Sequence, residues 1–422
     1  MSETVAELAP VKPAFQGFLS VRIGWRNLWR NRRRTWLTAG SIAFAVLLVV
    51  FTMAFQLGQY GVMIDNATTL ISGHIQVQSR EFVADSRFED TMAEASGLVT
   101  GIASIPGVIA VAPRVETFAL ASADERSFGA QVIGIDVDAE ARTVRITKML
   151  KSGHGITATE EALLGTVLAR NLGVALGDEV IILGSGKEGG VAAMVVRVAG
   201  LLESGITDLD RVLLLAHLDV VQDAFGLHDE VHTLAVRVDD VANSERITGS
   251  IQAQLPAALI ARDWPEVMPD LYQSIEIDRL SGQIMYGIIM GLVAFSVVNS
   301  FIMTVFERTR EFGMLLAIGM KPRRIIAMLQ WESLFQWLVG VGIGLLLASI
   351  LVGWFAKEGI YLGEALEDYA QQFYMPSRLY PAFSTEALLT APVIMLLATQ
   401  FASLIPALRI HRLRPVEALR ST

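Results

Sequence analysis

The sequence predicts a membrane α-helical protein with four transmembrane helices and a large α+β extracytoplasmic domain inserted between the first and second helices. Of its 422 residues, 52% are hydrophobic and the mean hydropathy is +0.47, which is too apolar for a soluble chain of this length. The apolar residues gather in four long runs. Charge divides the chain in the same way, because residues 61–279 hold 32 Asp and Glu against 16 Lys and Arg, whereas the remainder holds 11 against 18.

The first span is assigned to residues 35–60, inside a run of 30 residues without a formal charge. About 20 apolar residues are enough to cross a bilayer. A cleaved signal peptide is the alternative, but the run is too long for one and no A-x-A site follows it. Residues 1–34 are expected to be a cytoplasmic N-terminus with an amphipathic helix on the membrane surface. The predicted membrane-interface residues are Trp25, Arg26, Trp29, Arg32, Arg33 and Arg34.

Three further spans follow the acidic region. They are residues 280–306, in an uncharged run of 27 residues; residues 326–356, where Glu332 is the one charge; and residues 385–408, which include two prolines. A membrane helix tolerates proline because neighbouring groups satisfy the freed backbone. Each run is long enough to span a bilayer.

Orientation follows from the basic residues, since short positively charged segments are retained in the cytoplasm. One basic segment precedes the first span, one lies between the second and third, and one follows the fourth. A four-span topology places all three on one side, which predicts a multi-pass protein of a bacterial inner membrane with both termini cytoplasmic. Residues 61–279 and the short loop 357–384 are then periplasmic, and residues 409–422 form the cytoplasmic C-terminus.

The periplasmic region has an α+β pattern. Alternating and β-branched runs predict strands at residues 74–78, 108–111, 131–135, 179–183, 191–198, 211–215 and 233–238. Helix-like stretches occupy residues 96–104, 160–172, 218–225 and 244–255.

The sequence offers no active site, so we expect no enzyme activity and no cofactor or metal in this chain, and no nucleic-acid partner. The absence of cysteine excludes thiolate metal sites and a cysteine nucleophile. Residues 184–190, Gly-Ser-Gly-Lys-Glu-Gly-Gly, fail as a P-loop because Glu188 stands where Ser or Thr would hold magnesium, which favours a hairpin turn. His228 and His232 have i, i+4 spacing but lead into a strand, which favours a solvated loop over a metal site.

Glu332 is the one carboxylate inside a hydrophobic run, and such a residue is a functional candidate by default. It follows Arg324 by eight residues, about 12 Å of helix, so we favour contact with the inner interface or with basic groups of a neighbouring helix over proton or ion transfer. In the same span, Gly340, Gly342 and Gly344 predict close helix packing.

The cytoplasmic segment 307–325 is the most informative stretch. A basic loop has no need of its apolar middle, so we predict a short amphipathic helix that ends near Gly319 and Pro322 and presents an apolar face to a partner. Leu315→Asp or Leu316→Asp is expected to uncouple that partner. The predicted docking residues are Glu307, Arg308, Arg310, Glu311, Phe312, Gly313, Leu315, Leu316, Ile318 and Gly319.

Residues 307–325 read ERTREFGMLLAIGMKPRRI, and residues 406–420 begin with Pro-Ala and end with Pro-Val-Glu-Ala-Leu-Arg. These segments resemble the E-R-T-R-E-I-G signature and the P-x-E-A-L-R ending of the MacB, FtsX and LolC/LolE permeases, the type VII ABC superfamily. Residues 25–35 are similar to the family's opening amphipathic helix. Segments 73–77 and 132–136 of the periplasmic region resemble the LolC/LolE branch most closely.

The resemblance implies a mechanotransmission permease. Two permease chains form a homodimer or a LolC/LolE-like heterodimer, and a separate cytoplasmic ABC ATPase, which binds ATP and Mg²⁺, docks on the helix in residues 307–325. The periplasmic domain is expected to combine a porter-like part with an inserted subdomain and to work with a periplasmic adaptor or carrier. Met320-Lys321-Pro322 departs from the family pattern, and the proline is expected to shorten the docking helix.

Extraction or export of lipoproteins, lipids or other amphiphiles is the leading function that the resemblance implies. MacB-like drug or peptide efflux is one alternative, although MacB carries a fused ATPase that this sequence does not show. FtsX-like regulation of a cell-wall hydrolase is the other, although its outer domain is usually smaller. A membrane-bound enzyme is disfavoured because no catalytic site is recognisable.

Overall fold

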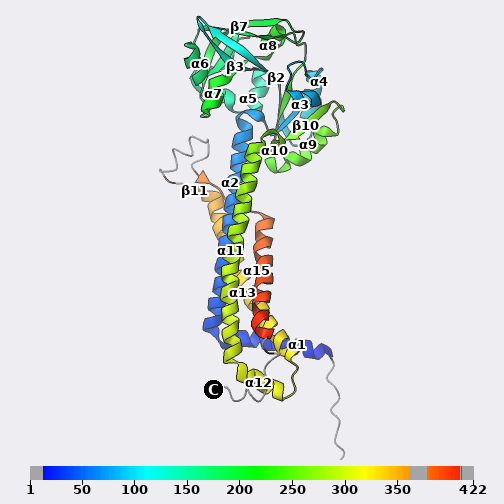
Figure 1. Ribbon diagram of the computed structural model, residues 1–422, viewed down its shortest axis with the longest axis vertical. Helices are drawn as coiled ribbons and strands as arrows, with labels where there is room; N and C mark the ends of the chain where they lie inside the picture. The colour runs from blue at the N-terminus through cyan, green and yellow to red at the C-terminus, as the bar shows by residue number, and fades with distance from the viewer. Residues whose placement is uncertain (1–12, 362, 364–377, 409, 411–422) are drawn as a thin grey trace, which may run out of the picture. The chain divides into compact units, whose positions relative to one another are not determined.

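The computed structural model describes residues 13–361, 363, 378–408 and 410 (Figure 1). The chain divides into two compact units. A helical unit contains Met1–Gln59, Ile277–Tyr361 and Arg378–Thr422, and an α/β unit contains Tyr60–Glu276 and Leu362–Ser377. The C-terminal motif beyond residue 410 and most of the loop 357–384 lie outside the described residues.

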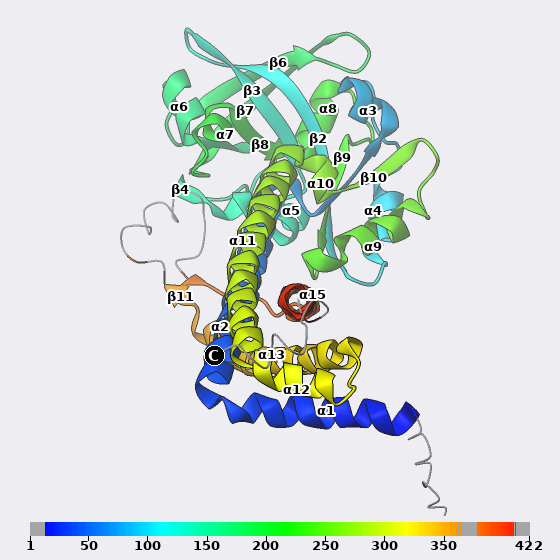
Figure 2. The ribbon, with the colours of Figure 1, turned by 60° about the horizontal axis from the view of Figure 1, so that its bottom comes forward.

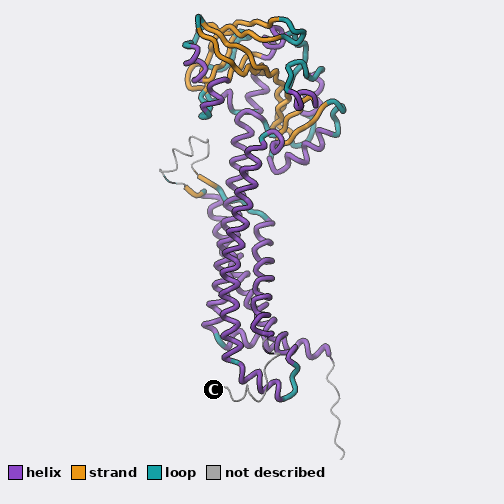
Figure 3. Tube along the Cα trace, viewed as in Figure 1, coloured by secondary structure: helices purple, strands orange, loops and turns teal. Residues whose placement is uncertain are grey.

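Four helices are long and apolar enough to cross a membrane (Figure 3). They are α2 (Arg32–Ala67), which continues into the π-helical turn η1 (Thr68–Ser72), α11 (Pro269–Glu307), α13 (Pro322–Glu358) and α15 (Thr385–Leu408). The helical unit also contains α1 (Pro13–Arg30), α12 (Thr309–Ala317) and the two-stranded pair β11 (Ile360–Tyr361) and β12 (Arg378–Leu379). Both α2 and α11 have residues in each unit.

Small residues bring α2 and α13 together. A Cβ added at Gly340 would lie 2.8 Å from the carbonyl oxygen of Ala39, and one added at Gly344 would lie 2.7 Å from that of Ala43. A Cβ at Gly342 would meet nothing within 4 Å. Close packing is therefore confirmed for Gly340 and Gly344 and is wrong for Gly342, which a helix of 3.6 residues per turn points away from the other two.

The α/β unit is built on one sheet of ten strands, with order β10-β1-β9-β2-β3-β8-β5-β7-β4 and with β6 paired to β2 and β7. The strands are β1 (Ile75–Ser79), β2 (Val108–Ala123), β3 (Arg126–Ile135), β4 (Leu150–Gly153), β5 (Glu161–Gly165), β6 (Glu179–Ser185), β7 (Val191–Leu202), β8 (Leu213–His217), β9 (Thr233–Val238) and β10 (Leu259–Asp263). The sheet is mixed, since β3 runs parallel to β8 and β5 to β7, whereas the other pairs are antiparallel.

Short helices connect these strands (Figure 2). They are α3 (Arg80–Asp85), α4 (Ala95–Ala103), α5 (Val137–Thr143), α6 (Thr166–Leu172), α7 (Thr207–Val212), α8 (Leu218–Phe225), α9 (Ser244–Gln252) and α10 (Trp264–Val267), with 3₁₀ turns η2 (Ile146–Lys148) and η3 (Val241–Asn243). Alternation along β2 buries Ala119 and Ala121 in the main core and leaves Phe118 and Leu120 exposed. This is the expected pattern for a sheet with one covered face.

The structure corrects two expectations for this unit. The helix predicted at residues 160–172 is strand β5 followed by helix α6, because the short apolar run Ala162–Leu164 pairs between β7 and β8. Short buried runs suit strand and helix equally until their neighbours are known. His232 is fully buried rather than solvated, although His228 is exposed. The predicted hairpin turn is confirmed, since Gly186 N–H donates to the Gly190 carbonyl at 2.8 Å between β6 and β7.

Candidate coupling site

The helix α12 is a short element between two long ones. Arg308 interrupts the helical backbone after α11, with φ −104° and ψ 12°, and α12 begins at Thr309. It ends at Ala317, and Gly319 then takes φ +97°, a conformation that side chains other than glycine adopt only with strain. Pro322 occupies the first turn of α13, where its missing N–H costs nothing. The proline thus starts the third candidate span, and α12 ends before Gly319.

Arg308 holds α12 against α13. Its Nη1 lies 3.1 Å from Oε2 of Glu332, its Nε lies 3.0 Å from Oε2 of Glu311, and its guanidinium carbon lies 5.2 Å from the ring centroid of Phe312. The side chains of Arg308 and Glu332 are 9% and 3% exposed. Glu332 therefore contacts a basic group of a neighbouring element, the interpretation that the sequence favoured. Buried charges of this kind require a partner, because each one alone would carry a large desolvation cost.

Two further ion pairs join α12 and the end of α11 to the N-terminal segment. Arg30, at the end of α1, donates from Nη2 to both carboxylate oxygens of Glu311 at 2.8 and 2.9 Å. Arg34, at the start of α2, donates to Glu307 at 2.8 Å. Burial tends to raise the pKa of Glu311, but the hydrogen bonds from Arg30 and Arg308 outweigh it and lower that pKa below its usual range. We call these six residues the arginine–glutamate network: Arg30, Arg34, Glu307, Arg308, Glu311 and Glu332.

The inner face of α12 packs against the protein. Phe312 is fully buried, Gly313 is buried beside it, and Leu315 and Leu316 are partly buried against the same apolar cluster. The buried members of that cluster are Val305, Phe312, Ile325, Met328, Leu329, Ala407 and Ile410. Four of the predicted docking residues are therefore on the buried side of α12: Phe312 and Gly313 are buried, and Leu315 and Leu316 are partly buried.

The outer face of α12 is smaller than the sequence suggested. Ile318 is 85% exposed and Met314 is 48% exposed. Arg310 and Gly319 are exposed beside them. A partner protein that reaches α12 would thus meet Met314, Ile318 and Arg310 first. Hydrophobic periodicity identified the helix, but it could not say which of its apolar residues would pack against α11, α13 and the residues near the C-terminus.

The predicted membrane-interface residues lie around the junction of α1 and α2. Trp25, Arg26, Trp29, Arg32 and Arg33 are exposed, whereas the side chain of Arg34 is 18% exposed and paired with Glu307. The sequence pattern did not reveal that Arg30 and Arg34 belong to the arginine–glutamate network.

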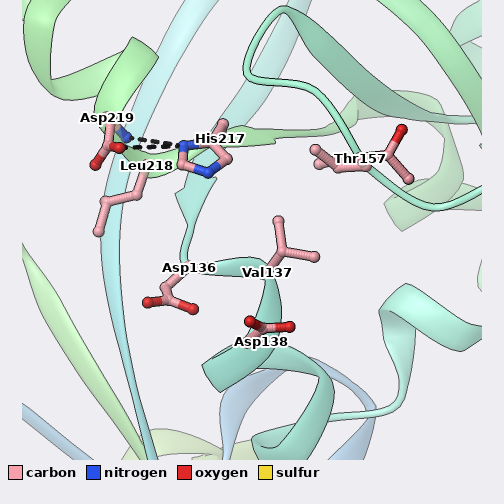
Figure 4. Close-up of a pocket in the computed structure, with 8 residues that line it drawn as sticks. Asp136, Val137, Asp138, Thr157, His217, Leu218 and Asp219 are labelled. Atoms are coloured by element: carbon pink, nitrogen blue, oxygen red, sulfur yellow. Dashed lines mark hydrogen bonds and ion pairs between the residues drawn. The ribbon is translucent and has the colours of Figure 1, made fainter.

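A polar pocket of about 390 Å³ lies in the α/β unit, lined in part by Asp136, Asp138, His217 and Asp219 (Figure 4). Two of these side chains accept hydrogen bonds from backbone N–H groups. Asp136 caps α5 by accepting from the N–H of Ala139 at 2.9 Å, and the His217 ring accepts from the N–H of Asp219 at 3.4 Å. These contacts give the pocket a structural role at the starts of α5 and α8.

Comparison with known proteins agrees with this architecture. A model of the MacB-like periplasmic core domain matches residues 35–254, and a model of the FtsX-like permease C-terminal domain matches residues 284–415. The chain belongs to the family of FtsX- and MacB-like ABC transporter permeases. The second match contains α12 and most of the arginine–glutamate network.

Two relatives of this permease match most of its length. The transmembrane protein LolC of the lipoprotein-releasing system of Xylella fastidiosa is 25% identical over 95% of this chain and 98% of its own length. The macrolide export ATP-binding/permease protein MacB of Nitrobacter winogradskyi is 26% identical over 95% of this chain and 60% of its own length. The periplasmic region of MacB from Actinobacillus actinomycetemcomitans, a solved structure, aligns with 51% of this chain and 97% of that one at 15% identity and a TM-score of 0.37.

Proposed function

We propose that this permease couples ATP hydrolysis by a separate cytoplasmic ATPase to movement of its periplasmic domain, and that it serves the extraction or export of lipoproteins, lipids or other amphiphiles. In this proposal both termini and α12 are cytoplasmic, and the α/β unit, inserted between the first and second spans, is periplasmic. A second permease chain, identical or LolC/LolE-like, completes the membrane part, and ATP and Mg²⁺ are bound by the ATPase.

The observation that carries the proposal is the way α12 is held. Its inner face is buried, and the arginine–glutamate network fixes its N-terminal end to α1 and α13 and fixes the end of α11, just before it, to α2. Its outer face exposes Met314 and Ile318. A force applied to that face is therefore passed to long helices rather than absorbed by a mobile loop. Both α2 and α11 run without a break from the helical unit into residues of the α/β unit, which supports mechanical coupling.

The substrate class rests on the relatives. The match to LolC extends over nearly the full length of both chains, whereas the match to MacB covers 60% of that relative. LolC belongs to a lipoprotein-releasing system, so an amphiphile with acyl chains is the proposed cargo here. This part of the proposal is by analogy with the relatives and is tested separately from the docking surface.

The docking surface is tested with Ile318→Asp, because a residue that is 85% exposed tolerates a charge without loss of folding. The full-length permease is expressed with the genes that flank its own and purified through a tag. The wild-type chain is expected to retain an ATPase subunit, and Ile318→Asp is expected to lower that retention at least about tenfold, as loss of an interface anchor does. Leu315→Asp is a weaker test, since it also disturbs the apolar cluster beneath α12.

The matched control is Ile109→Asp, which places the same charge on an exposed isoleucine of β2 and should leave ATPase retention unchanged. Equal retention by wild type and Ile318→Asp would show that the ATPase does not dock on this surface. Lipids and lipoproteins in the purified complex are identified by mass spectrometry. Recovery of a cell-wall hydrolase in their place would overturn the proposed cargo and favour a regulatory function.

A further inference from the structure

The junction of α1 and α2 carries basic and aromatic side chains on one exposed face. Arg22, Trp25, Arg26 and Trp29 are spaced by three and four residues, so they lie on the same side of α1. All four are exposed. The opposite side of α1 is occupied by the protein, because Leu28 is fully buried and a Cβ added at Gly24 would lie 3.1 Å from the Cβ of Trp331 in α13.

The chain turns between Arg30 and Arg32, and the turn is held in a fixed shape. The hydroxyl of Thr35 donates to the carbonyl of Leu28 at 2.5 Å, and the N–H of Thr35 donates to the carbonyl of Asn31 at 3.1 Å. Arg32 and Arg33 are exposed at this turn. The elbow, defined as residues 22–36, therefore presents a preformed surface immediately before the apolar run of α2.

Charge on the elbow divides into satisfied and unsatisfied groups. Arg30 and Arg34 are paired with Glu311 and Glu307. Among the described residues, the guanidinium groups of the other four arginines have no ion pair or hydrogen bond: Arg22, Arg26, Arg32 and Arg33. Four exposed cations with no acidic partner among the described residues are free to bind an anion from outside the chain.

The aromatic residues indicate that the anion would be bound at the level of the lipid headgroups. The ring centroids of Trp25 and Trp29 lie 6.0 Å apart and those of Trp29 and Trp36 lie 6.4 Å apart, with edge-to-face geometry, so the three indoles follow the elbow in a row. Tryptophan concentrates at the level of lipid headgroups, and arginine binds phosphate oxygens through paired N–H donors. A face that mixes both residue types suits headgroups, whereas the usual amphipathic helix separates an apolar face from a charged one.

We propose that the elbow is a binding site for anionic phospholipid headgroups, with the guanidinium groups of Arg22, Arg26, Arg32 and Arg33 on the phosphates and the tryptophan row beside the glycerol region. The site needs the four spans but neither the ATPase nor the cargo, so it stands if the proposed function fails. Its occupant is a membrane lipid, because the arginines directly precede the membrane-spanning part of α2.

The test is lipid selectivity in vesicles. The full-length permease is reconstituted into phosphatidylcholine containing a trace of spin-labelled phosphatidylglycerol or of spin-labelled phosphatidylcholine, and the association of each label with the protein is measured by electron paramagnetic resonance. The wild type is expected to prefer phosphatidylglycerol. Arg32→Gln with Arg33→Gln should reduce the preference at least about threefold, since one arginine near an anionic surface contributes about fivefold at low salt.

The control removes the same charge elsewhere. Arg170→Gln with Arg246→Gln neutralises two exposed arginines of the α/β unit and should leave the preference unchanged. Equal preferences in the wild type and the elbow variant, or an equal loss in the control, would overturn the proposal. Inorganic phosphate is then compared with chloride at matched ionic strength. No difference is expected for a lipid site, and displacement of the lipid by phosphate would identify a site for the free anion instead.

Discussion

The guanidinium of Arg308 and the carboxylate of Glu332 form a buried ion pair, with 3.1 Å between Nη1 and Oε2. The pair joins the start of α12 to the N-terminal third of α13. The pair mainly constrains the positions of the two helices. Removing one partner of a buried pair lowers the stability by about 3–5 kcal/mol, whereas replacing both partners by apolar groups changes it little. Arg308 also contacts Glu311 and Phe312, so one side chain fixes both the end and the inner face of α12.

Arg308→Met is therefore expected to lower the free energy of unfolding by about 3 kcal/mol, since Glu332 would remain buried without its partner. Arg308→Met combined with Glu332→Leu should recover most of that loss. The double-mutant cycle compares the wild type, Arg308→Met, Glu332→Leu and the double variant. Thermal unfolding of these four proteins in one detergent gives the coupling free energy of the pair. Additive effects of the two substitutions would show that the pair does not act as a unit. Glu332→Gln should keep transport if the carboxylate serves only as the partner of Arg308, and loss of transport with unchanged stability would give it a proton or ion role.

The pair of Arg30 and Glu311 is expected to matter for coupling more than for stability. Both side chains are about half exposed, and exposed pairs contribute about 0–1 kcal/mol. Arg30→Gln, which leaves the contact between Glu311 and Arg308 in place, should thus leave thermal unfolding nearly unchanged. Because it frees α1 from α12, it should lower the stimulation of the ATPase by cargo at least about threefold, a loss of about 0.7 kcal/mol of coupling. Glu203→Gln breaks the comparably exposed pair with Lys151 in the α/β unit and serves as the control. Equal stimulation in both variants would argue against transmission through Arg30.

The glycines of α13 allow a comparison within one helix. Gly344→Ala is expected to destabilise the permease by about 1–3 kcal/mol, because the new methyl would lie 2.7 Å from the backbone oxygen of Ala43 and overpacking has costs of that size. Gly342→Ala has open space and should be neutral or stabilising by up to about 1 kcal/mol, the difference in helix propensity. Thermal unfolding of the two variants separates them. A similar effect of both substitutions would mean that α2 and α13 are not in close contact at Gly344.

The sequence sufficed for features that hydrophobicity and charge determine locally. The four candidate spans follow from long apolar runs, α12 follows from an apolar stretch between charged residues, and the turn at residues 186–190 follows from its glycines. Features that depend on distant partners did not follow. Nothing in the local pattern of residues 161–165 distinguishes a strand between β7 and β8 from a helix. The pairing of Arg30 with Glu311 joins residues 281 positions apart, and a run of arginines looks the same whether its members meet glutamate or lipid.

His232 predicts the pH dependence of the α/β unit. Its ring is fully buried between Phe82 and Phe88, with centroid distances of 5.0 and 4.9 Å, and its Nδ1 accepts from the N–H of Glu116 at 3.1 Å. Burial lowers the pKa of His232 below its usual 6.5, so the folded ring stays neutral while the unfolded chain takes up a proton. The unfolded state then binds more protons below about pH 6.5, and stability falls as the pH decreases, by at most about 1.4 kcal/mol per pH unit.

Thermal unfolding of the full-length permease between pH 7.5 and 5.5 checks this sign. His232→Gln should show a shallower loss of stability on acidification than the wild type, and His228→Gln, on an exposed histidine four residues earlier, should follow the wild type. Burial raises the pKa of Glu116, which contributes a slope of opposite sign because its folded form retains a proton that the unfolded chain releases as the pH rises. Both variants retain Glu116, so subtracting one stability curve from the other cancels the contribution of Glu116. Parallel curves for His232→Gln and His228→Gln would mean that the buried ring takes up its proton without unfolding.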